Sequence, residues 1–290
     1  MLRQILVLVR PTQWIKNGVV LAALLFAGEA SNVALAEQAV LATIIFCLLA
    51  SAVYIFNDLL DADKDRLHPH KKDRPIASGR ISTVQASVMI VVLMAISLAG
   101  SWWLGRNFMI AAASYLILNA LYTVWFKHVV MLDVMSIALG FVIRAFAGAA
   151  AIGVPASKWL LVTTLFLALF LAFGKRRHEL LLLEDNATSH RKILGKYSPY
   201  LLDQCIGVTT AAVVVMYMLY TFSAEVSQKL GTHDLYFTIP FVVYGIFRYL
   251  YLIHKEERGG SPTHVLINDR PILVTVVLWI LSVVLILYLV

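Results

Sequence analysis

Long apolar stretches alternate with short polar ones along almost the whole chain. Nine of them approach the length that an α-helix needs to cross a bilayer, about 20 residues. They cover residues 18–36, 39–56, 84–104, 108–126, 132–152, 159–173, 204–224, 235–253 and 272–290, the sixth being short. The pattern predicts an all-α integral membrane protein with nine transmembrane helices.

Three polar connections between these stretches are longer than a tight turn. They cover residues 57–83, 174–203 and 254–271. Because the spans between them are even in number, the three connections lie on the same side of the membrane. The first two follow spans that are four apart, which hints at a duplicated architecture whose loops face one cavity. We expect a single transmembrane domain, residues 1–290, with these loops capping the active site.

Composition and charge narrow the class of protein. Of the 290 residues, 60% are hydrophobic and 14% charged, and the mean hydropathy is +0.81, which excludes a soluble globular domain. Most lysines and arginines lie in loops on one side, whereas the loops on the other side hold only Arg106, Lys158 and Lys229. The positive-inside rule therefore places the N-terminus and the three long connections in the cytoplasm.

The net charge of +7 follows from this asymmetry, and it favours attraction to anionic lipid or phosphate over nucleic-acid binding. Residues 1–16 are basic and lack a small-residue cleavage site, so we expect no cleavable signal. Cys47 and Cys205 lie in spans and form no Cys-x-x-Cys motif. We expect neither a disulfide nor a zinc site from them.

The acidic segment, residues 57–65, is the most polar part of the chain. If the preceding helix continues through it, one arc of about 100° holds Tyr54, Asn57, Asp58, Asp61 and Asp65, whereas Asp63 points away. No base shares that arc, so a cation has to come from outside. Like charges resist joint ionisation unless a hard divalent cation lies between them, and Mg²⁺ suits two carboxylates and a phosphate. The alternative is a solvated charged loop that binds nothing.

Basic residues surround this segment in the sequence. Lys71, Lys72, Arg74 and Arg80 follow it and are candidate phosphate partners. Lys16 either reaches a phosphate near the acidic segment or only contributes positive charge on the inner side. His68 and His70 either contact phosphate or are solvated.

Arg144 lies deep in the fifth span, about 16 Å along the helix axis from Asp133 on the same face. A central arginine costs about 2.5–3.5 kcal/mol on insertion, so it must face a protein cavity. There it either holds an anion or forms a structural pair with an acidic side chain.

Two further polar groups lie at the predicted cytoplasmic boundary. On a helix, Lys175 and Glu179 share a face, which places a base and an acid side by side. Asp269 and Arg270 precede the last span and form either a lid or a helix cap, of which the cap is favoured.

The pattern Asn-Asp-x-x-Asp-x-x-x-Asp, followed by Arg74-Pro75, resembles the first aspartate-rich motif of the UbiA superfamily of intramembrane prenyltransferases. The residues Tyr122 and Lys127 and the number of spans agree with this resemblance. The superfamily usually carries a second motif, Asp-x-x-x-Asp, after the sixth span. Here residues 175–179 read Lys-Arg-Arg-His-Glu, with one acid in register.

The altered second motif resembles that of one branch of the superfamily. Five further segments resemble the same branch, namely residues 10–17, 68–71, 132–134, 144–148 and 261–271. The resemblance implies transfer of a 5-phosphoribosyl group from phosphoribosyl pyrophosphate to a polyprenyl phosphate, decaprenyl phosphate, for cell-wall arabinan synthesis. It implies a UbiA-like fold with a central cavity that opens to the cytoplasm, in a bacterial inner membrane. Relatives also suggest a homo-oligomer.

The resemblance also implies roles for individual residues. The magnesium ligands would be Asn57, Asp58, Asp61 and Asp65, and the catalytic groups Asp58, Asp61, Asp65 and Glu179. The residues that bind the substrates would be Lys16, Tyr54, Lys71, Arg74, Tyr122, Lys127, Arg144, Lys175 and Arg176.

Three other functions fit parts of the pattern. A prenyltransferase that joins a prenyl diphosphate to an aromatic acceptor would use the same acidic segment. An ion-coupled secondary transporter also uses inward-facing carboxylates and a deep arginine. The polar residues cluster at cytoplasmic ends rather than at mid-membrane, which argues against the transporter, and the aligned acidic segment argues against an inert scaffold.

Overall fold

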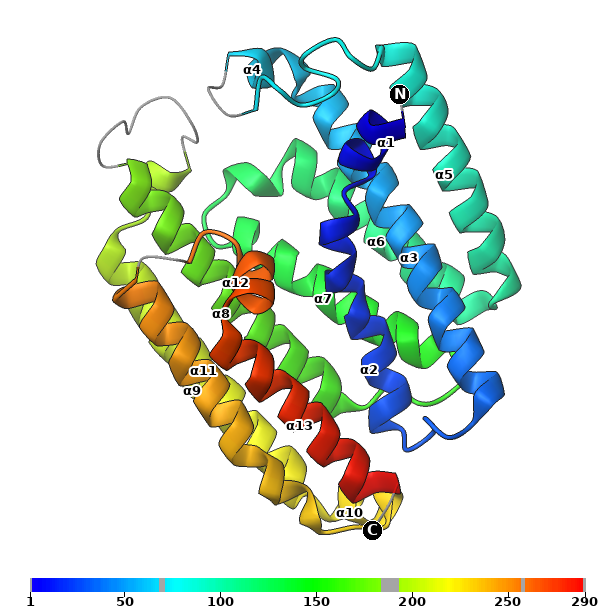
Figure 1. Ribbon diagram of the computed structural model, residues 1–290, viewed down its shortest axis with the longest axis vertical. Coiled ribbons are helices and arrows are strands. Elements are labelled where there is room, and N and C mark those ends of the chain that lie inside the picture. The colour runs from blue at the N-terminus through cyan, green and yellow to red at the C-terminus, as the bar shows by residue number, and fades with distance from the viewer. Residues whose placement is uncertain (1, 68–70, 184–192, 257–258, 289–290) are drawn as a thin grey trace. The chain divides into compact units, whose positions relative to one another are not determined.

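The computed structural model describes residues 2–67, 71–183, 193–256 and 259–288, and the regular elements in these ranges are all helical (Figure 1). The α-helices are α1 Leu2–Val9, α2 Val19–Phe26, α3 Val33–Leu60, α4 Ala62–Arg66, α5 Thr83–Trp103, α6 Arg106–Val124, α7 Leu132–Ala151, α8 Lys158–Leu183, α9 Pro199–Phe222, α10 Ala224–Leu230, α11 Ile239–His254, α12 Pro262–Asn268 and α13 Arg270–Tyr288. The 3-10 helices are η1 Pro11–Gly18, η2 Phe126–His128, η3 Leu194–Lys196 and η4 Asp234–Thr238.

Eight helices in the described part of the chain are long and apolar enough to cross a membrane. In a bilayer a helix satisfies all its backbone hydrogen bonds internally, so chains of this composition form helices. The prediction of an all-helical, multi-pass membrane protein is confirmed. The count of nine crossings stays a prediction.

The prediction of one continuous span at residues 18–36 is wrong. Helix α2 ends at Phe26, Gly28 has a φ of +76°, and Asn32 caps the start of α3 by accepting a hydrogen bond from the amide of Leu35. Hydropathy reports only composition, and it did not register the turn at Gly28 or the cap at Asn32. The chain before α3 therefore consists of short helices.

The chain forms two compact units. The first consists of Met1–Leu24, Asn32–Thr123 and Ile143–Pro155, and the second of Leu25–Ser31, Val124–Val142 and Ala156–Val290. Helix α7 contributes residues 132–142 to the second unit and the rest to the first. That residues 1–290 form a single transmembrane domain stays a prediction.

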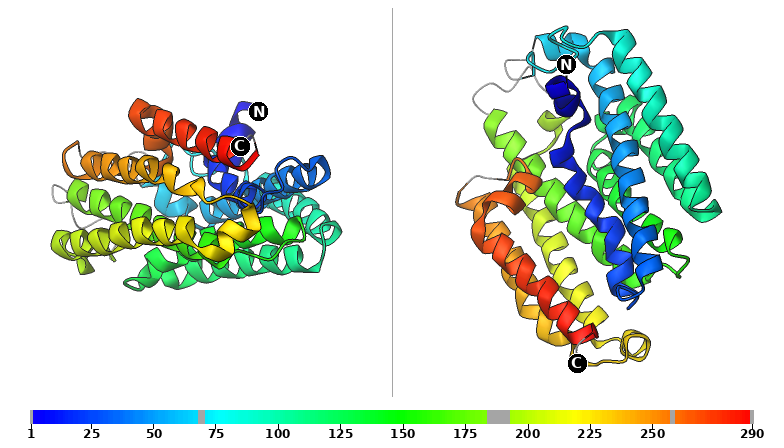
Figure 2. Two further views of the ribbon diagram at one scale, coloured as in Figure 1. Left: turned by 90° about the horizontal axis from the view of Figure 1, so that it is seen from below. Right: turned by 45° about the vertical axis from the view of Figure 1, so that its right-hand side comes forward.

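In the first unit α3 lies along α5, and α1 and η1 pack on α3 (Figures 1 and 2). Phe46 on α3 packs edge-on against Phe108 and Tyr115 of α6. A second buried cluster joins Leu8 of α1 and Ile55 of α3 to Ile76, Ile81 and Ala86. This cluster packs the described residues 76–86 of the chain after the acidic segment against α1 and α3.

In the second unit α8 packs along α9, and α11 lies beside α13 (Figure 1). Asp269 caps α13, because its Oδ1 accepts a hydrogen bond from the backbone amide of Ile272, 3.0 Å away. Its other oxygen accepts from Arg248 Nη2 at 2.8 Å. The structural role predicted for Asp269 is confirmed.

Helix α8 continues well beyond its predicted end at residue 173. It runs to Leu183, so residues 174–183 form part of a helix rather than a loop. The side chains of Lys175 and Glu179 therefore do lie one helical turn apart.

Candidate functional site

The acidic segment keeps helical spacing across a break in the helix. Helix α3 ends at Leu60, and Asp61 has φ −93° and ψ 4° before α4 begins. Backbone hydrogen bonds nevertheless link Asp61 to Asn57 (3.0 Å) and Asp65 to Asp61 (2.8 Å). Asp58 and Asp65 are each 4% exposed and therefore lie on the interior side.

Asp63 differs from its neighbours. Its side chain is 92% exposed, and it accepts a hydrogen bond from Arg66 at 2.9 Å. The prediction that Asp63 points away from the other carboxylates is confirmed.

Two arginines from other parts of the chain bind the buried carboxylates. Nη1 of Arg74 donates to Asp58 at 2.9 Å and to Asp65 at 2.7 Å. Nη2 of Arg10 donates to both oxygens of Asp58, at 2.6 and 2.7 Å. Arg10 also lies over the ring of Tyr54, 5.4 Å from its centroid. The cation that was expected from outside the segment is thus supplied in part by the protein itself.

Sequence reasoning missed the role of Arg10. This residue lies between α1 and η1 in the left-handed region, with φ 56° and ψ 61°, and Pro11 follows it. A residue before proline is disfavoured in the right-handed helical region, so the dipeptide Arg10-Pro11 could have indicated a break there. The pairing with Asp58 joins residues 48 positions apart, and no local pattern reports it.

Asn57 contacts α6. The hydroxyl oxygen of Thr123 lies 2.7 Å from Asn57 Oδ1 and 2.8 Å from the carbonyl oxygen of Asn119. Thr123 is 7% exposed and is the next residue after Tyr122, which is half-buried. Sequence analysis did not select Thr123, because a threonine inside an apolar helix carries no charge or motif.

The donor set of the acidic segment suits a hard divalent cation. Carboxylate and amide oxygens are the ligands that Mg²⁺ prefers, and a single nitrogen of Arg74 already lies between Asp58 and Asp65. Two carboxylates that converge on one positive group can share a cation. Within the described residues no cluster of three His, Cys, Asp or Glu side chains has metal-binding geometry, so such an ion would need ligands from Asn57 or from a substrate.

Arg144 is buried within the first unit and only 5% exposed. Its Nε donates to Asn17 Oδ1 at 2.7 Å, and its Nη2 donates to the hydroxyl of Tyr115 at 2.9 Å. The guanidinium also lies 4.7 Å from the centroid of the Tyr115 ring. The prediction that Arg144 faces the protein interior is confirmed, and these described hydrogen bonds go to neutral groups.

The second unit contains a buried charged network. Arg176, 2% exposed, donates from Nε to Asp133 at 2.7 Å and from Nη1 to Glu179 at 2.6 Å. The hydroxyl of Tyr197 donates to the other oxygen of Asp133 at 2.7 Å and accepts from the amide of Met131 at 2.8 Å. Burial, together with the hydrogen bond to Asp133, raises the pKa of Tyr197, so its phenol remains a donor at neutral pH.

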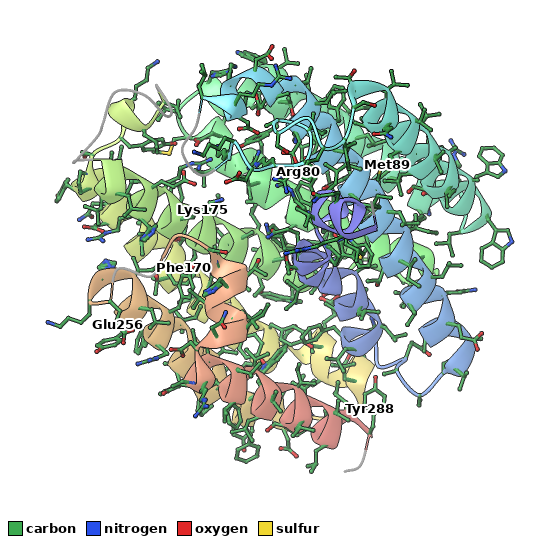
Figure 3. All side chains as sticks on the ribbon, turned by 45° about the horizontal axis from the view of Figure 1, so that its top comes forward. Arg80, Met89, Phe170, Lys175, Glu256 and Tyr288 are labelled. Carbon is green, nitrogen blue, oxygen red and sulfur yellow. The ribbon has the colours of Figure 1, made fainter. Side chains whose placement is uncertain are left out.

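Lys175 and Arg176 have different environments, although both were predicted to bind substrate. The side chain of Lys175 is 44% exposed, and its Nζ lies 3.6 Å from Glu179 Oε1. Figure 3 labels Lys175 on α8, farther along the helix than the buried Phe170. Lys175 is therefore open to solvent, whereas the buried Arg176 links Asp133 to Glu179.

The remaining predicted site residues are distributed over both units. Lys16 in η1 and Asp61 are half-buried, and Lys71 is exposed. Tyr122 belongs to the first unit and Lys127, half-buried in η2, to the second. His68 and His70 lie outside the described residues.

A multi-pass helical protein with an Asn-Asp-x-x-Asp segment at the end of an apolar helix has the features of an intramembrane prenyltransferase. The chain belongs to the UbiA prenyltransferase family, whose model matches residues 18–268.

Relatives of known name cover most of the chain. Decaprenyl-phosphate phosphoribosyltransferase of Mycolicibacterium smegmatis is 37% identical over 283 residues, which are 94% of this chain and 88% of that protein. The protein of the same name from Corynebacterium glutamicum is 34% identical over 284 residues, 96% of this chain and 85% of its own length.

The fold also matches solved structures. A UbiA homolog from Archaeoglobus fulgidus, bound to GPP and Mg²⁺, superposes with a TM-score of 0.72 at 20% identity, covering 98% of this chain and 99% of that one. At this identity the match establishes the shared fold.

Proposed function

We propose that this protein transfers the 5-phosphoribosyl group of phosphoribosyl pyrophosphate to a polyprenyl phosphate and releases pyrophosphate. Two relatives named decaprenyl-phosphate phosphoribosyltransferase, 37% and 34% identical over nearly the full chain, support the proposal. Decaprenyl phosphate is the proposed acceptor, and the product would serve cell-wall arabinan synthesis.

The polar end of α8 is the observation that carries the choice of donor. There Lys175 is exposed and Glu179 is half-buried. Arg176 donates a hydrogen bond to Glu179. A prenyl diphosphate has one diphosphate group, whereas phosphoribosyl pyrophosphate has two separate phosphate groups and ribose hydroxyls. A base beside a single acid suits the second donor, because it can bind a phosphate and a hydroxyl together.

The acidic segment is the proposed magnesium site, with its ligands drawn from Asn57, Asp58, Asp61 and Asp65. When bound, Mg²⁺ neutralises the negative charge that develops on the departing pyrophosphate. Arg74 now lies between Asp58 and Asp65, so a cation there would share or displace its contacts. Arg74, Lys16 and Lys71 would then bind phosphate oxygens, and Tyr54 would contact the donor.

The bond from ribose C1 to the pyrophosphate oxygen breaks as an oxygen of the acceptor phosphate bonds to C1. The acceptor is already an anion, so no strong general base is required. Glu179 orients a ribose hydroxyl by accepting its hydrogen bond, Lys127 and Tyr122 contact the acceptor, and Arg144 contributes positive potential. Stabilising the charge of the leaving group is the larger part of the rate enhancement.

The lipid acceptor accounts for the membrane fold. Each buried CH₂ of a polyprenyl tail contributes about 0.8 kcal/mol, so a long tail cannot be moved into water. The reaction must therefore take place where the tail remains in hydrocarbon and a water-soluble donor can enter. We propose the inner membrane of a bacterium, with the N-terminus and the acidic segment on the cytoplasmic side.

Purified protein in detergent tests the proposal directly. In two reactions the protein is incubated with labelled phosphoribosyl pyrophosphate and decaprenyl phosphate, once with Mg²⁺ and once with EDTA. In a third reaction geranyl diphosphate and an aromatic acceptor replace both substrates, in the presence of Mg²⁺. We expect a labelled lipid only with the phosphoribosyl donor and Mg²⁺. Consumption of geranyl diphosphate without any phosphoribosyl lipid would show a prenyltransferase instead, and uptake into liposomes without turnover would show a transporter.

A further inference from the structure

Thr123 makes two contacts that one hydroxyl proton cannot serve together. Its Oγ1 is 2.7 Å from Asn57 Oδ1 and 2.8 Å from the carbonyl oxygen of Asn119. A hydroxyl has one hydrogen to donate, and both neighbours in this arrangement are oxygens. One of the two close oxygen pairs would therefore have no proton between them.

The other orientation of the Asn57 amide removes this conflict. Thr123 is 7% exposed at the end of α6, where a threonine hydroxyl donates to the carbonyl four residues earlier, here Asn119. Its lone pairs then face the Asn57 side chain. An amide keeps almost the same shape when its oxygen and nitrogen exchange places, so Nδ2 can donate to Thr123 with both contacts satisfied.

We infer that Thr123 is a positioning residue that turns the amide oxygen of Asn57 toward a bound cation. With Nδ2 held by Thr123, Oδ1 lies on the side of the amide away from α6. The opposite orientation would present N–H hydrogens, which carry partial positive charge, to the metal. This inference rests on the proposed function, because it takes Asn57 as a ligand of the metal in that site.

The contact joins two helices, since Asn57 lies on α3 and Thr123 on α6. The two residues are 66 positions apart in the sequence, so the packing of α6 on α3 brings the Thr123 hydroxyl to the Asn57 amide. A simple packing role would need only the volume of the threonine side chain. The positioning role needs its oxygen, and the two roles therefore predict different outcomes for an isosteric substitution.

The test measures Mn²⁺ binding by electron paramagnetic resonance on full-length protein, alone and with inorganic pyrophosphate. Thr123→Val keeps the shape and removes the acceptor, and we expect its Mn²⁺ affinity to fall about tenfold, in the range typical of lost outer-shell contacts to a metal ligand. Thr123→Ser keeps the hydroxyl, and we expect it to bind Mn²⁺ within about twofold of the parent. Thermal melting without metal checks that each variant is folded.

The background Asn57→Asp separates orientation from packing. A carboxylate has two equivalent oxygens and needs no orientation, so Thr123→Val should change Mn²⁺ affinity less than about twofold there. An equal loss in both backgrounds, an unaffected Thr123→Val, or a parent protein that binds no Mn²⁺ under either condition would overturn the inference. If the protein binds Mn²⁺ as expected but forms no phosphoribosyl lipid, the role of Thr123 is supported and the proposed donor is refuted.

Discussion

Neighbouring aspartates of the acidic segment have very different surroundings. Asp58 and Asp65 are buried and bound by Arg74. The side chain of Asp63 is exposed, and its described ion pair is with Arg66. An exposed ion pair of this kind contributes at most about 1 kcal/mol. The chain thus contains its own control for any test of the site.

Asp61→Asn should lower the turnover number at least about 100-fold, because it removes the negative charge of a proposed metal ligand where leaving-group charge develops. Asp63→Asn should retain most of the activity, because its side chain is exposed and faces away. The phosphoribosyl-transfer assay measures both, with melting temperatures as the check on folding. Equal losses in the two variants would contradict the assignment of the metal face.

Lys175 and Arg176 are adjacent bases with different expected effects. Lys175→Gln should raise KM for phosphoribosyl pyrophosphate about tenfold, the loss of one charge-assisted hydrogen bond, without changing the melting temperature. Asp133→Asn should instead lower stability by roughly 3–5 kcal/mol, because it removes the buried one of the two carboxylates that pair with Arg176 and leaves the part-exposed Glu179. Thermal unfolding and donor kinetics measured on both variants distinguish the two effects. A melting temperature lowered as much by Lys175→Gln as by Asp133→Asn would show that Lys175 is structural.

Close approaches between helices depend on glycines in this chain. Gly148 of α7 lies against α2 in the first unit, where an added Cβ would collide with the carbonyl oxygen of Val20 and come within 2.9 Å of its carbonyl carbon. These are backbone atoms, so no side chain can move aside. The same helix places Arg144 beside Asn17 and Tyr115, so the crossing also determines the surroundings of the buried guanidinium.

Gly148→Ala should destabilise the protein by about 1–3 kcal/mol, because α2 and α7 must move apart. Gly207→Ala on α9 is the matched control, since no atom lies within 4 Å of the added Cβ and alanine favours a helix by about 0.5–1 kcal/mol over glycine. Thermal unfolding in detergent should show a lower midpoint for the first variant and an equal or higher midpoint for the second. Indistinguishable midpoints would mean that the crossing tolerates the extra methyl group.

The molecule as a whole combines apolar helices with charged segments that follow individual helices. Eight helices in the described chain are long enough to cross a bilayer, and the acidic segment and the end of α8 follow two of them. Basic loops are retained on the cytoplasmic side during insertion. A water-soluble sugar phosphate has access from that side only if the orientation is as proposed.

Single cysteines test this orientation in intact cells. In a Cys47→Ser/Cys205→Ser background, Lys229→Cys should react with a membrane-impermeant maleimide, because it lies in a loop predicted to be outside. Lys72→Cys should react only after the cells are permeabilised. Both positions are exposed, so accessibility within the fold does not separate them. The reverse pattern of labelling would place the acidic segment outside and rule out a cytoplasmic donor.

The sequence by itself determined the class of the fold and the location of the acidic segment. Apolar stretches of membrane length must become helices, because a backbone in hydrocarbon has to satisfy its own hydrogen bonds. The separation of Asp63 from Asp58 and Asp65 follows from helical spacing alone, which persists through the break at Asp61. These features are local, so a local pattern predicts them.

Only the tertiary structure decided which partner each polar side chain has. Arg10 binds Asp58 across 48 residues, Asp133 binds Arg176 across 43, and Thr123 meets Asn57 across 66. Such pairs depend on how separate helices pack, and spacing along one helix carries no information about a neighbouring helix. The family resemblance assigned Lys175 and Arg176 the same role, and packing left Lys175 exposed and buried Arg176.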